Sequence, residues 1–145
     1  MSTIWMRRAQ CSRRARRLLG DITLLTDAYR RAAEQLSDGF DENVFSDAHG
    51  IRRILAVRFD ELEAYLIAGD LPDTWETTRR ERLSAIIDKT DASVDKARTQ
   101  HNEMLLLEYE ANGMDPHALE HIRQAVAGMD GILGGIEVMH TDDGE

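Results

Sequence analysis

Apolar and small side chains recur at alternating intervals of three and four residues along most of the chain, and this spacing limits the fold more than any other feature. The first series contains Ile4, Cys11, Ala15, Leu18, Ile22, Leu25, Tyr29, Ala32 and Leu36. Such intervals place side chains on one face of an α-helix. No segment alternates with a period of two for long enough to form a strand. We therefore expect an all-helical protein.

Breaks in the apolar spacing divide the chain into four expected helices. The two prolines, Pro72 and Pro116, both fall where the spacing stops. The predicted helices cover residues 3–37, 43–68, 74–112 and 116–139. The apolar faces of the last three contain Val44, Ala48, Ile51, Leu55, Leu62 and Tyr65, then Leu83, Ile87, Thr90, Val94, Ala97, His101 and Met104, then Leu119, Ile122, Val126, Met129, Leu133 and Ile136.

Capping residues agree with these boundaries. Asp73, with Glu76 three residues later, predicts a capping box at the start of the third helix. Asn112 and Gly113 predict the end of that helix, because both residue types are favoured just after a last helical turn. Asp115, directly before a proline, is a favourable N-cap for the fourth helix.

The short connections between the helices indicate how they pack. Connections of about four to seven residues make sequential helices antiparallel neighbours. The fold prediction is an antiparallel up-down-up-down helical bundle of four helices with staggered ends. With 145 residues and 42% hydrophobic content, the chain has the size of one domain, residues 1–145. Residues 141–145 are expected to be a frayed acidic tail.

Charge is distributed unevenly along the sequence. The segment 7–17 contains six arginines and no acid, whereas residues 18–145 hold the other twelve basic residues and all 27 acids. The arginines are Arg7, Arg8, Arg13, Arg14, Arg16 and Arg17. An acidic body repels nucleic acid and anionic membranes. We therefore expect the arginines to form at most a weak, salt-sensitive polyanion contact, or to pair with acids of this or another protein.

Cysteine content and hydropathy bear on the compartment. Cys11 is the single cysteine in the sequence, so no intramolecular disulfide can form, and a cytoplasmic location is the simplest expectation. No apolar run approaches the roughly 18 residues that span a bilayer, so we expect no membrane association.

Three histidines are candidates for a metal site. His117 and His121 are four residues apart on the fourth predicted helix, which places both on one face. Together with His49, in the segments "DAHGIRRIL" and "PHALEHIRQ", they resemble the DinB-like four-helix metalloproteins. The resemblance implies a bundle with one histidine from the second helix and a His-x-x-x-His pair from the fourth. At about 100° per residue, however, all three point away from their apolar faces. We therefore predict no metal site and keep this trio as an alternative.

His49 also suggests a second alternative. The segment "HGIRR", His49 to Arg53, resembles the His-x-Leu-Lys-Gly setting of histidine phosphotransfer domains. The resemblance implies a helical signalling module in which His49 accepts a phosphoryl group and Arg52 stands beside it. Arg53 departs from the family pattern, which has a glycine there.

Motifs typical of enzymes are missing from the sequence. It has no HExxH and no GxSxG motif, and "GMDGILGG" follows no strand that could make it a nucleotide loop. No pair of Glu-x-x-His motifs lies on inward faces, as a di-iron bundle requires. We expect a protein that is not an enzyme and that needs no cofactor.

Unequal helix lengths predict surfaces that the chain itself does not cover. Residues 1–11 should overhang one end of the bundle, with the third helix starting level with them and its last dozen residues projecting at the other end. The projecting part contains Met104, Leu105, Leu106 and Leu107, which span about 300° of the helix circumference. Gly128, Gly131 and Gly135 on the fourth helix would allow close approach by another helix.

These features together predict a non-enzymatic helical interaction protein, such as an adaptor, chaperone or regulatory subunit. We expect it to form a homo-oligomer or to bind a helical protein partner through the projecting part. Nucleic acid is a weaker candidate partner, through the arginine-rich segment. The alternatives are a phosphotransfer module using His49 and a metal-binding bundle using His49, His117 and His121.

Overall fold

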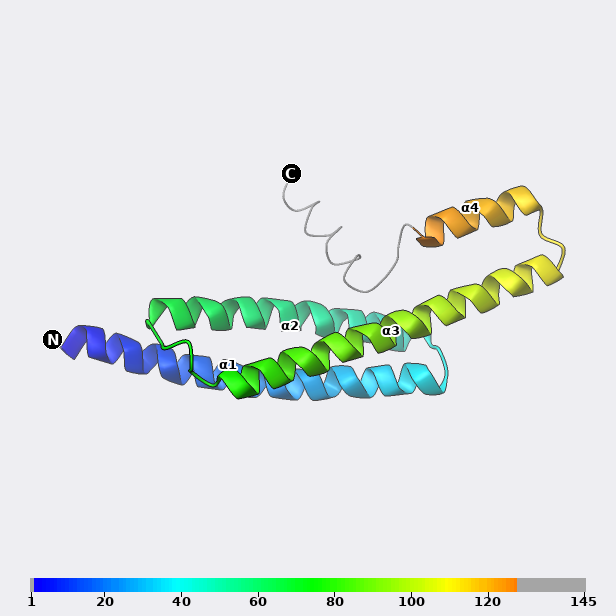
Figure 1. Cartoon of the computed structure of the whole chain (residues 1–145). Coiled ribbons are helices and arrows are strands. Elements are labelled where there is room, and N and C mark those ends of the chain that lie inside the picture. The colour runs from blue at the N-terminus through cyan, green and yellow to red at the C-terminus, as the bar shows by residue number, and fades with distance from the viewer. Residues whose placement is uncertain (1, 128–145) are drawn as a thin grey trace.

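The structure of the protein is all helical in the part that it describes. The computed structural model describes the backbone of residues 2–127 and the side chains of residues 5–127. It contains the helices α1 (Ser2–Asp38), α2 (Glu42–Ala68), α3 (Thr77–Ala111) and α4 (Pro116–Ala127), and no strand within these residues (Figure 1). The all-α prediction is confirmed. The expected extension of the fourth helix to residue 139, the glycines Gly128, Gly131 and Gly135, and the tail 141–145 lie outside the described residues.

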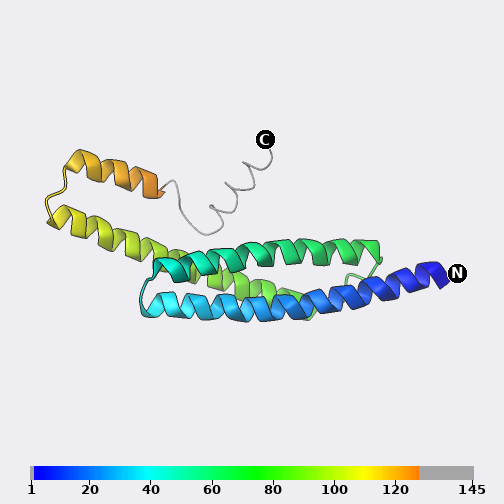
Figure 2. The same ribbon diagram turned by 180° about the vertical axis from the view of Figure 1, so that it is seen from behind.

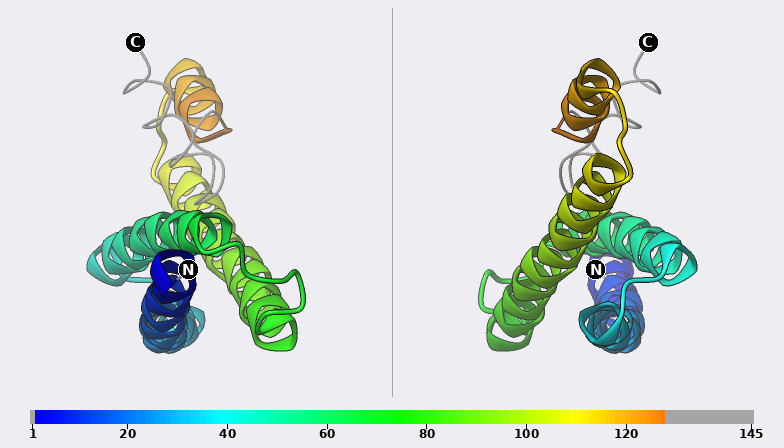
Figure 3. Two further views of the ribbon diagram at one scale, coloured as in Figure 1. Left: turned by 90° about the vertical axis from the view of Figure 1, so that its left-hand side faces the viewer. Right: turned by 90° about the vertical axis from the view of Figure 1, so that its right-hand side faces the viewer.

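Helix α1 is the central element of the packing. It packs against both α2 and α3, which lie beside it along much of its length (Figures 1 and 2). Seen along the molecule, α2 and α3 spread apart from α1 on different sides (Figure 3). The described part of α4 packs mainly on α3, at the end far from the N-terminus. The core is therefore a bundle of three helices, and the described part of α4 does not complete the predicted bundle of four.

The core consists largely of the predicted apolar faces. Its buried members from those faces are Cys11, Ala15, Leu18, Ile22, Tyr29, Ala32, Leu36, Ala48, Leu55, Leu62, Leu83, Ile87, Thr90, Val94 and Ala97. Leu119 of α4 is buried outside this core. Leu19, Thr26 and Ala33 are buried as well. Because α1 contacts two helices, it buries a stripe wider than a single row of side chains.

The end of α2 fits closely against α1. At Gly69, which caps α2, an added Cβ atom would lie only 2.6 Å from the Cβ of Cys11. Arg8 secures this contact: its Nε donates to the Gly69 carbonyl at 3.3 Å, and its Nη2 forms an ion pair with Asp70 at 3.1 Å. Residue 69 must therefore be glycine for the two helices to approach this closely.

The predicted start of α3 at residue 74 is wrong, and so is the capping box. Glu76 has a left-handed backbone (φ 46°) and makes no side-chain capping bond. Residues 72–75 form a separate turn, closed by a bond from the Trp75 N–H to the Pro72 carbonyl. Arg80 then donates to the carbonyls of Trp75 and Asp73. These bonds use the backbone groups that a helix starting at residue 74 would have used.

The register of α3 also differs from the prediction. Arg79, near its first turn, donates to the Thr23 hydroxyl at 3.1 Å, so α3 starts well inside α1 and not level with residues 1–11. At the other end, Arg98 pairs with Glu42 at 2.9 Å, and the His101 ring stacks on Phe40 at 4.0 Å. Residues 102–111 therefore extend past the turn between α1 and α2, as expected (Figure 1).

The predicted end of α3 and start of α4 are confirmed. Asn112 is the C-cap of α3, and Gly113 takes a left-handed backbone (φ 82°) that favours glycine. The Met114 N–H then donates to the Tyr109 carbonyl at 3.0 Å, and α4 starts at Pro116. We call residues 102–127, which comprise the end of α3, this turn and α4, the arm.

Candidate functional site

A buried polar cluster joins the three core helices. The Tyr29 hydroxyl of α1 donates to Asp91 Oδ1 of α3 at 2.5 Å. The Nε of Arg52, from α2, donates to both carboxylate oxygens of Asp91, at 3.0 and 3.3 Å. Asp91 is 5% exposed and Tyr29 is fully buried. We call these three residues the core triad.

The electrostatics of the core triad favour a structural role. Burial, followed by the hydrogen bond to the Asp91 carboxylate, raises the pKa of Tyr29 far above its usual value. This tyrosine therefore remains a neutral donor, unlike a catalytic acid or base poised near pH 7. None of the three residues lines the groove described below. The triad ties α1, α2 and α3 together in one register.

The core triad could not be predicted from the sequence. Apolar spacing predicts only that Tyr29 lies in the core, and Asp91 lies next to Thr90 in a helix rich in exposed acids. The sequence shows that Arg52 and Asp91 lie beside apolar faces of their helices. It does not show that they pair with each other, or that Asp91 accepts from Tyr29, which is 62 positions away.

The structure does not bring the three candidate metal ligands together. Among residues 2–127, no three His, Cys, Asp or Glu side chains are grouped so that they could hold a metal ion. His117 and His121 are both exposed, and their rings meet edge to face with centroids 6.5 Å apart. His49 is not part of a three-ligand group with them. The geometry implied by the DinB-like resemblance is therefore not found in the described part of the chain.

His49 lies in a setting that differs from the phosphotransfer resemblance. It is half-buried, and burial, with a smaller contribution from the Arg53 charge, lowers its pKa. Arg52 was expected to stand beside a phosphoryl group on His49. Its guanidinium instead binds Asp91 in the core, with its side chain 14% exposed. That expectation for Arg52 is wrong, because the buried carboxylate is its partner.

His101 belongs to an aromatic cluster that holds α3 against the turn between α1 and α2. Its ring is parallel to that of Phe40 within 14°. The Arg98 guanidinium lies over the rings of Phe40 and Phe45, at 5.5 and 4.9 Å from their centroids. Such contacts between a cation and a ring are attractive. The cluster marks the point beyond which α3 leaves the core.

The six arginines of the N-terminal segment fall into two groups. Arg8 pairs with Asp70, and Arg14 donates to the Tyr65 hydroxyl at 3.5 Å, so both hold α1 to the end of α2. The other four, Arg7, Arg13, Arg16 and Arg17, are exposed and form no ion pair or side-chain hydrogen bond with another described residue. Their charges are available to a ligand.

Three of the free arginines share the outer face of α1 with apolar side chains. Trp5 and Met6 are 76% and 64% exposed. At about 100° per residue, these two side chains and Arg13, Arg16 and Arg17 lie within about 120° of the circumference, opposite the buried stripe. We call these five residues the arginine-rich face.

The arm exposes part of its apolar surface. Met104 and Leu107 are 69% and 65% exposed, whereas Leu105 and Leu106 are half-buried. Within the described residues, α4 packs on α3, and its Leu119 is buried. The predicted set of four side chains therefore divides into two half-buried and two exposed members.

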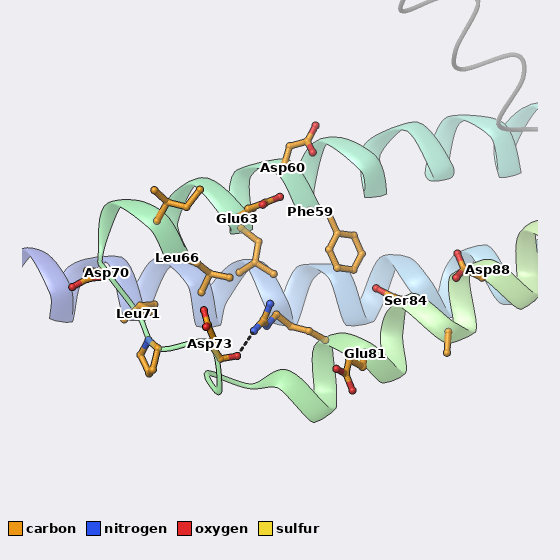
Figure 4. A pocket seen from close by; sticks show the side chains of 15 residues that line it. Phe59, Asp60, Glu63, Leu66, Asp70, Leu71, Asp73, Glu81, Ser84 and Asp88 are labelled. Atoms are coloured by element: carbon orange, nitrogen blue, oxygen red, sulfur yellow. Dashed lines mark hydrogen bonds between the residues drawn. The ribbon is translucent and has the colours of Figure 1, made fainter.

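A groove lies between α2 and α3, on the side away from α1 (Figure 4). It has a volume of about 900 Å³ and no α1 residue in its lining. Phe59 and Leu66 point into it from α2, and Leu71 closes one end (Figure 4). Acids surround these apolar side chains: Asp60, Glu63, Asp70, Asp73, Glu81 and Asp88. We call this site the acidic groove.

The single basic residue in the lining does not neutralise the acidic groove. Arg80 is held by backbone carbonyls of residues 73 and 75 and forms no ion pair with a described acid. Sequence reasoning missed this groove, because it depends on how far α2 and α3 spread apart from α1 (Figure 3).

Comparisons with known proteins do not assign the chain to a family. No model of a known protein family matches the sequence, and no curated protein or solved structure matches the chain. None of the described helices is both long enough and apolar enough to cross a membrane. The features that define the chain are therefore its all-helical fold and the surfaces described above.

Proposed function

We propose that this chain is a non-enzymatic helical interaction protein, acting in the cytoplasm as an adaptor, chaperone or regulatory subunit. Its sequential helices alternate in direction, and the arm is the part that another helical chain covers. The observation that supports this proposal is the exposed pair Met104 and Leu107 on a helix that has left its own core. Uncovered apolar side chains of this size each forgo roughly 1.5 to 3 kcal/mol of burial.

The polar chemistry of the chain supports the same proposal. The most buried ionisable cluster, the core triad, is fully occupied in joining helices. The described residues contain no group of three candidate metal ligands, and Arg52, which the phosphotransfer resemblance places beside a phosphoryl group, is bound to Asp91. The described residues thus present surfaces for docking and no assembled set of reacting groups.

The proposal is tested by placing a charge on the arm. Leu107→Asp should weaken self-association, or binding of a helical partner, because the carboxylate would be buried without a counterion. Light scattering or sedimentation equilibrium compares the mass of each variant with the 16.4 kDa chain.

Leu24→Asp is the matched control, because Leu24 is 73% exposed on α1, remote from the arm. Circular dichroism checks that both variants remain helical. A wild-type monomer that is thermally stable and binds no helical protein would contradict the proposal. That result would favour the alternative of a phosphotransfer module using His49.

A further inference from the structure

We propose that the acidic groove of one copy of this chain binds the arginine-rich face of a second copy. The inference rests on the proposed function only in treating the chain as an interaction protein, because it concerns a different surface from the arm. The contact would be made by the N-terminal turns of α1 in one copy and by α2 and α3 in the other.

The two surfaces match in their chemistry. The lining of the acidic groove contains apolar side chains such as Phe59 and Leu66 (Figure 4) and acids from both helices, Asp60 and Glu63 on α2 and Glu81 and Asp88 on α3. The arginine-rich face presents Trp5 and Met6 and, about two to three turns further, its three arginines. An arginine pairs with a carboxylate through two parallel N–H bonds, and Trp and Arg are the residues that most often dominate interfaces.

The lengths of the two surfaces are comparable. The α2 wall runs from Phe59 to Ile67 and the α3 wall from Arg80 to Asp88, and each spans about 12 Å at 1.5 Å per residue. At the same rise, the arginine-rich face spans about 12 Å from Trp5 to Arg13 and about 18 Å from Trp5 to Arg17. Trp5, Met6 and Arg13 of one helix thus fit within the length of the groove, and Arg16 and Arg17 extend past one end of it.

Other segments of the chain fit the groove less well. Residues 128–145 contain five acids and no lysine or arginine, so this segment is negatively charged like the groove and would be repelled by it. The N-terminal turns of the same molecule are held elsewhere, because α1 is one continuous helix and Arg8 fixes it to the end of α2. A second copy supplies the same basic turns without these constraints.

The geometry makes the contact head-to-tail. The arginine-rich face points away from the stripe that α1 buries against α2 and α3, whereas the groove opens between α2 and α3 and has no α1 residue in its lining. A molecule that docks its face in one neighbour therefore leaves its own groove free for another. Such contacts build chains or rings.

Charge reversal tests the contact directly. The groove variant Glu63→Lys/Glu81→Lys and the face variant Arg13→Glu/Arg16→Glu change exposed residues that make no ion pair in the structure. Each variant alone brings like charges together and should associate about tenfold or more weakly than the wild type. When the two variants alternate in an assembly, every contact again joins opposite charges, so association should return.

Sedimentation velocity should be run at about 0.05 M and about 0.5 M salt, because screening weakens contacts between exposed charges. Glu34→Lys/Asp47→Lys is the control, with the same change of charge at exposed positions outside the groove. The control should associate as the wild type does. All samples are repeated with Leu107→Asp added, so that loss of an arm contact is measured separately from loss of the groove contact.

Salt-sensitive association that each reversal removes and mixing restores, also in the Leu107→Asp background, is the expected result. A wild type that is monomeric at low salt would overturn the inference. In the Leu107→Asp background, a groove variant that associates as its Leu107→Asp parent does, or a mixture that stays dissociated, would also overturn it. In that background the outcome does not depend on whether the arm binds a partner.

Discussion

The two halves of α3 lie in contrasting environments, although they form one continuous helix. Between Leu83 and Ala97, apolar side chains alternate with Thr90 and Asp91 in a closely packed core. Beyond Arg98 and His101, the helix has only α4 beside it among the described residues, and Met104 and Leu107 face outward. One half is specified by buried contacts within the chain, and the other leaves apolar side chains exposed.

The comparison shows that one helix can bury a charged residue in its first half and expose apolar residues in its second half. In the core half, a charged residue is buried because Tyr29 and Arg52 satisfy it. In the arm half, apolar residues are exposed because the core helices have ended. Single substitutions test this division, beginning with the largest expected change in stability and ending with the smallest.

Removing the charge of Asp91 should have the largest effect. Asp91→Asn leaves the Arg52 guanidinium partly buried without its counterion, which costs about 3 to 5 kcal/mol when a buried pair is broken. Urea unfolding followed by circular dichroism measures the change. Glu103→Gln, on an exposed arm residue of the same helix, should stay within about 0.5 kcal/mol of the wild type. Equal effects at the two positions would contradict the division of α3.

Two glycines should respond to alanine with opposite signs. Gly69→Ala places a methyl group against Cys11 and should destabilise the fold by about 1 to 3 kcal/mol. Gly20, inside α1, has no atom within 4 Å of an added Cβ, so Gly20→Ala should raise the unfolding free energy by up to about 1 kcal/mol. Thermal unfolding compares the two variants. A stable Gly69→Ala would show that α1 and α2 can separate at this end.

The Tyr29 hydroxyl should give the core a loss of stability at alkaline pH. The pKa of Tyr29 is raised by folding, so its contribution is complete below its usual pKa of about 10 and is lost as the pH rises above that value. In this range the unfolded chain releases a proton that the folded chain retains. The unfolding free energy therefore falls by up to about 1.4 kcal/mol for each pH unit above this value.

Tyr29→Phe checks this linkage. At neutral pH it should cost about 1.5 to 3 kcal/mol, because a hydrogen bond to a charged acceptor is lost. Between about pH 10 and pH 11, its unfolding free energy should fall less steeply than that of the wild type, since phenylalanine has no proton to release. Urea unfolding at both pH values provides the measurement. Parallel slopes for the two proteins would show that Tyr29 already ionises in the folded state.

The packing of α1 could be predicted from sequence because it depends on short-range spacing. Residues such as Ala15 and Ile22 recur at helical intervals, and both are fully buried. The end of α3 at Asn112 was predictable for a similar reason, since it depends on the adjacent Gly113 and its left-handed backbone. Features that depend on residues within one or two helical turns can therefore be predicted from the sequence.

Features decided by the meeting of distant segments were not predictable in the same way. The capping box at Asp73 and Glu76 failed because Arg80 and Trp75 form a separate turn there. The acidic groove depends on the angle at which α2 and α3 leave α1, which no spacing rule specifies (Figure 3). Exposure of the arm, by contrast, followed from helix lengths alone, and its Met104 and Leu107 remain the candidate contacts that sequence and structure share.

The smallest effect is expected at Leu107 in the isolated chain. Leu107→Ala should change the unfolding free energy by less than about 0.5 kcal/mol, because the side chain is 65% exposed and leaves no cavity. Leu83→Ala, the same substitution in the core half of α3, should cost about 2 to 5 kcal/mol, because Leu83 is 5% exposed. Urea unfolding at low protein concentration compares both variants as separate chains. If Leu107→Ala becomes costly only as the concentration rises, the arm is covered by a second copy; a cost that is large at every concentration would mean that the chain itself buries this residue.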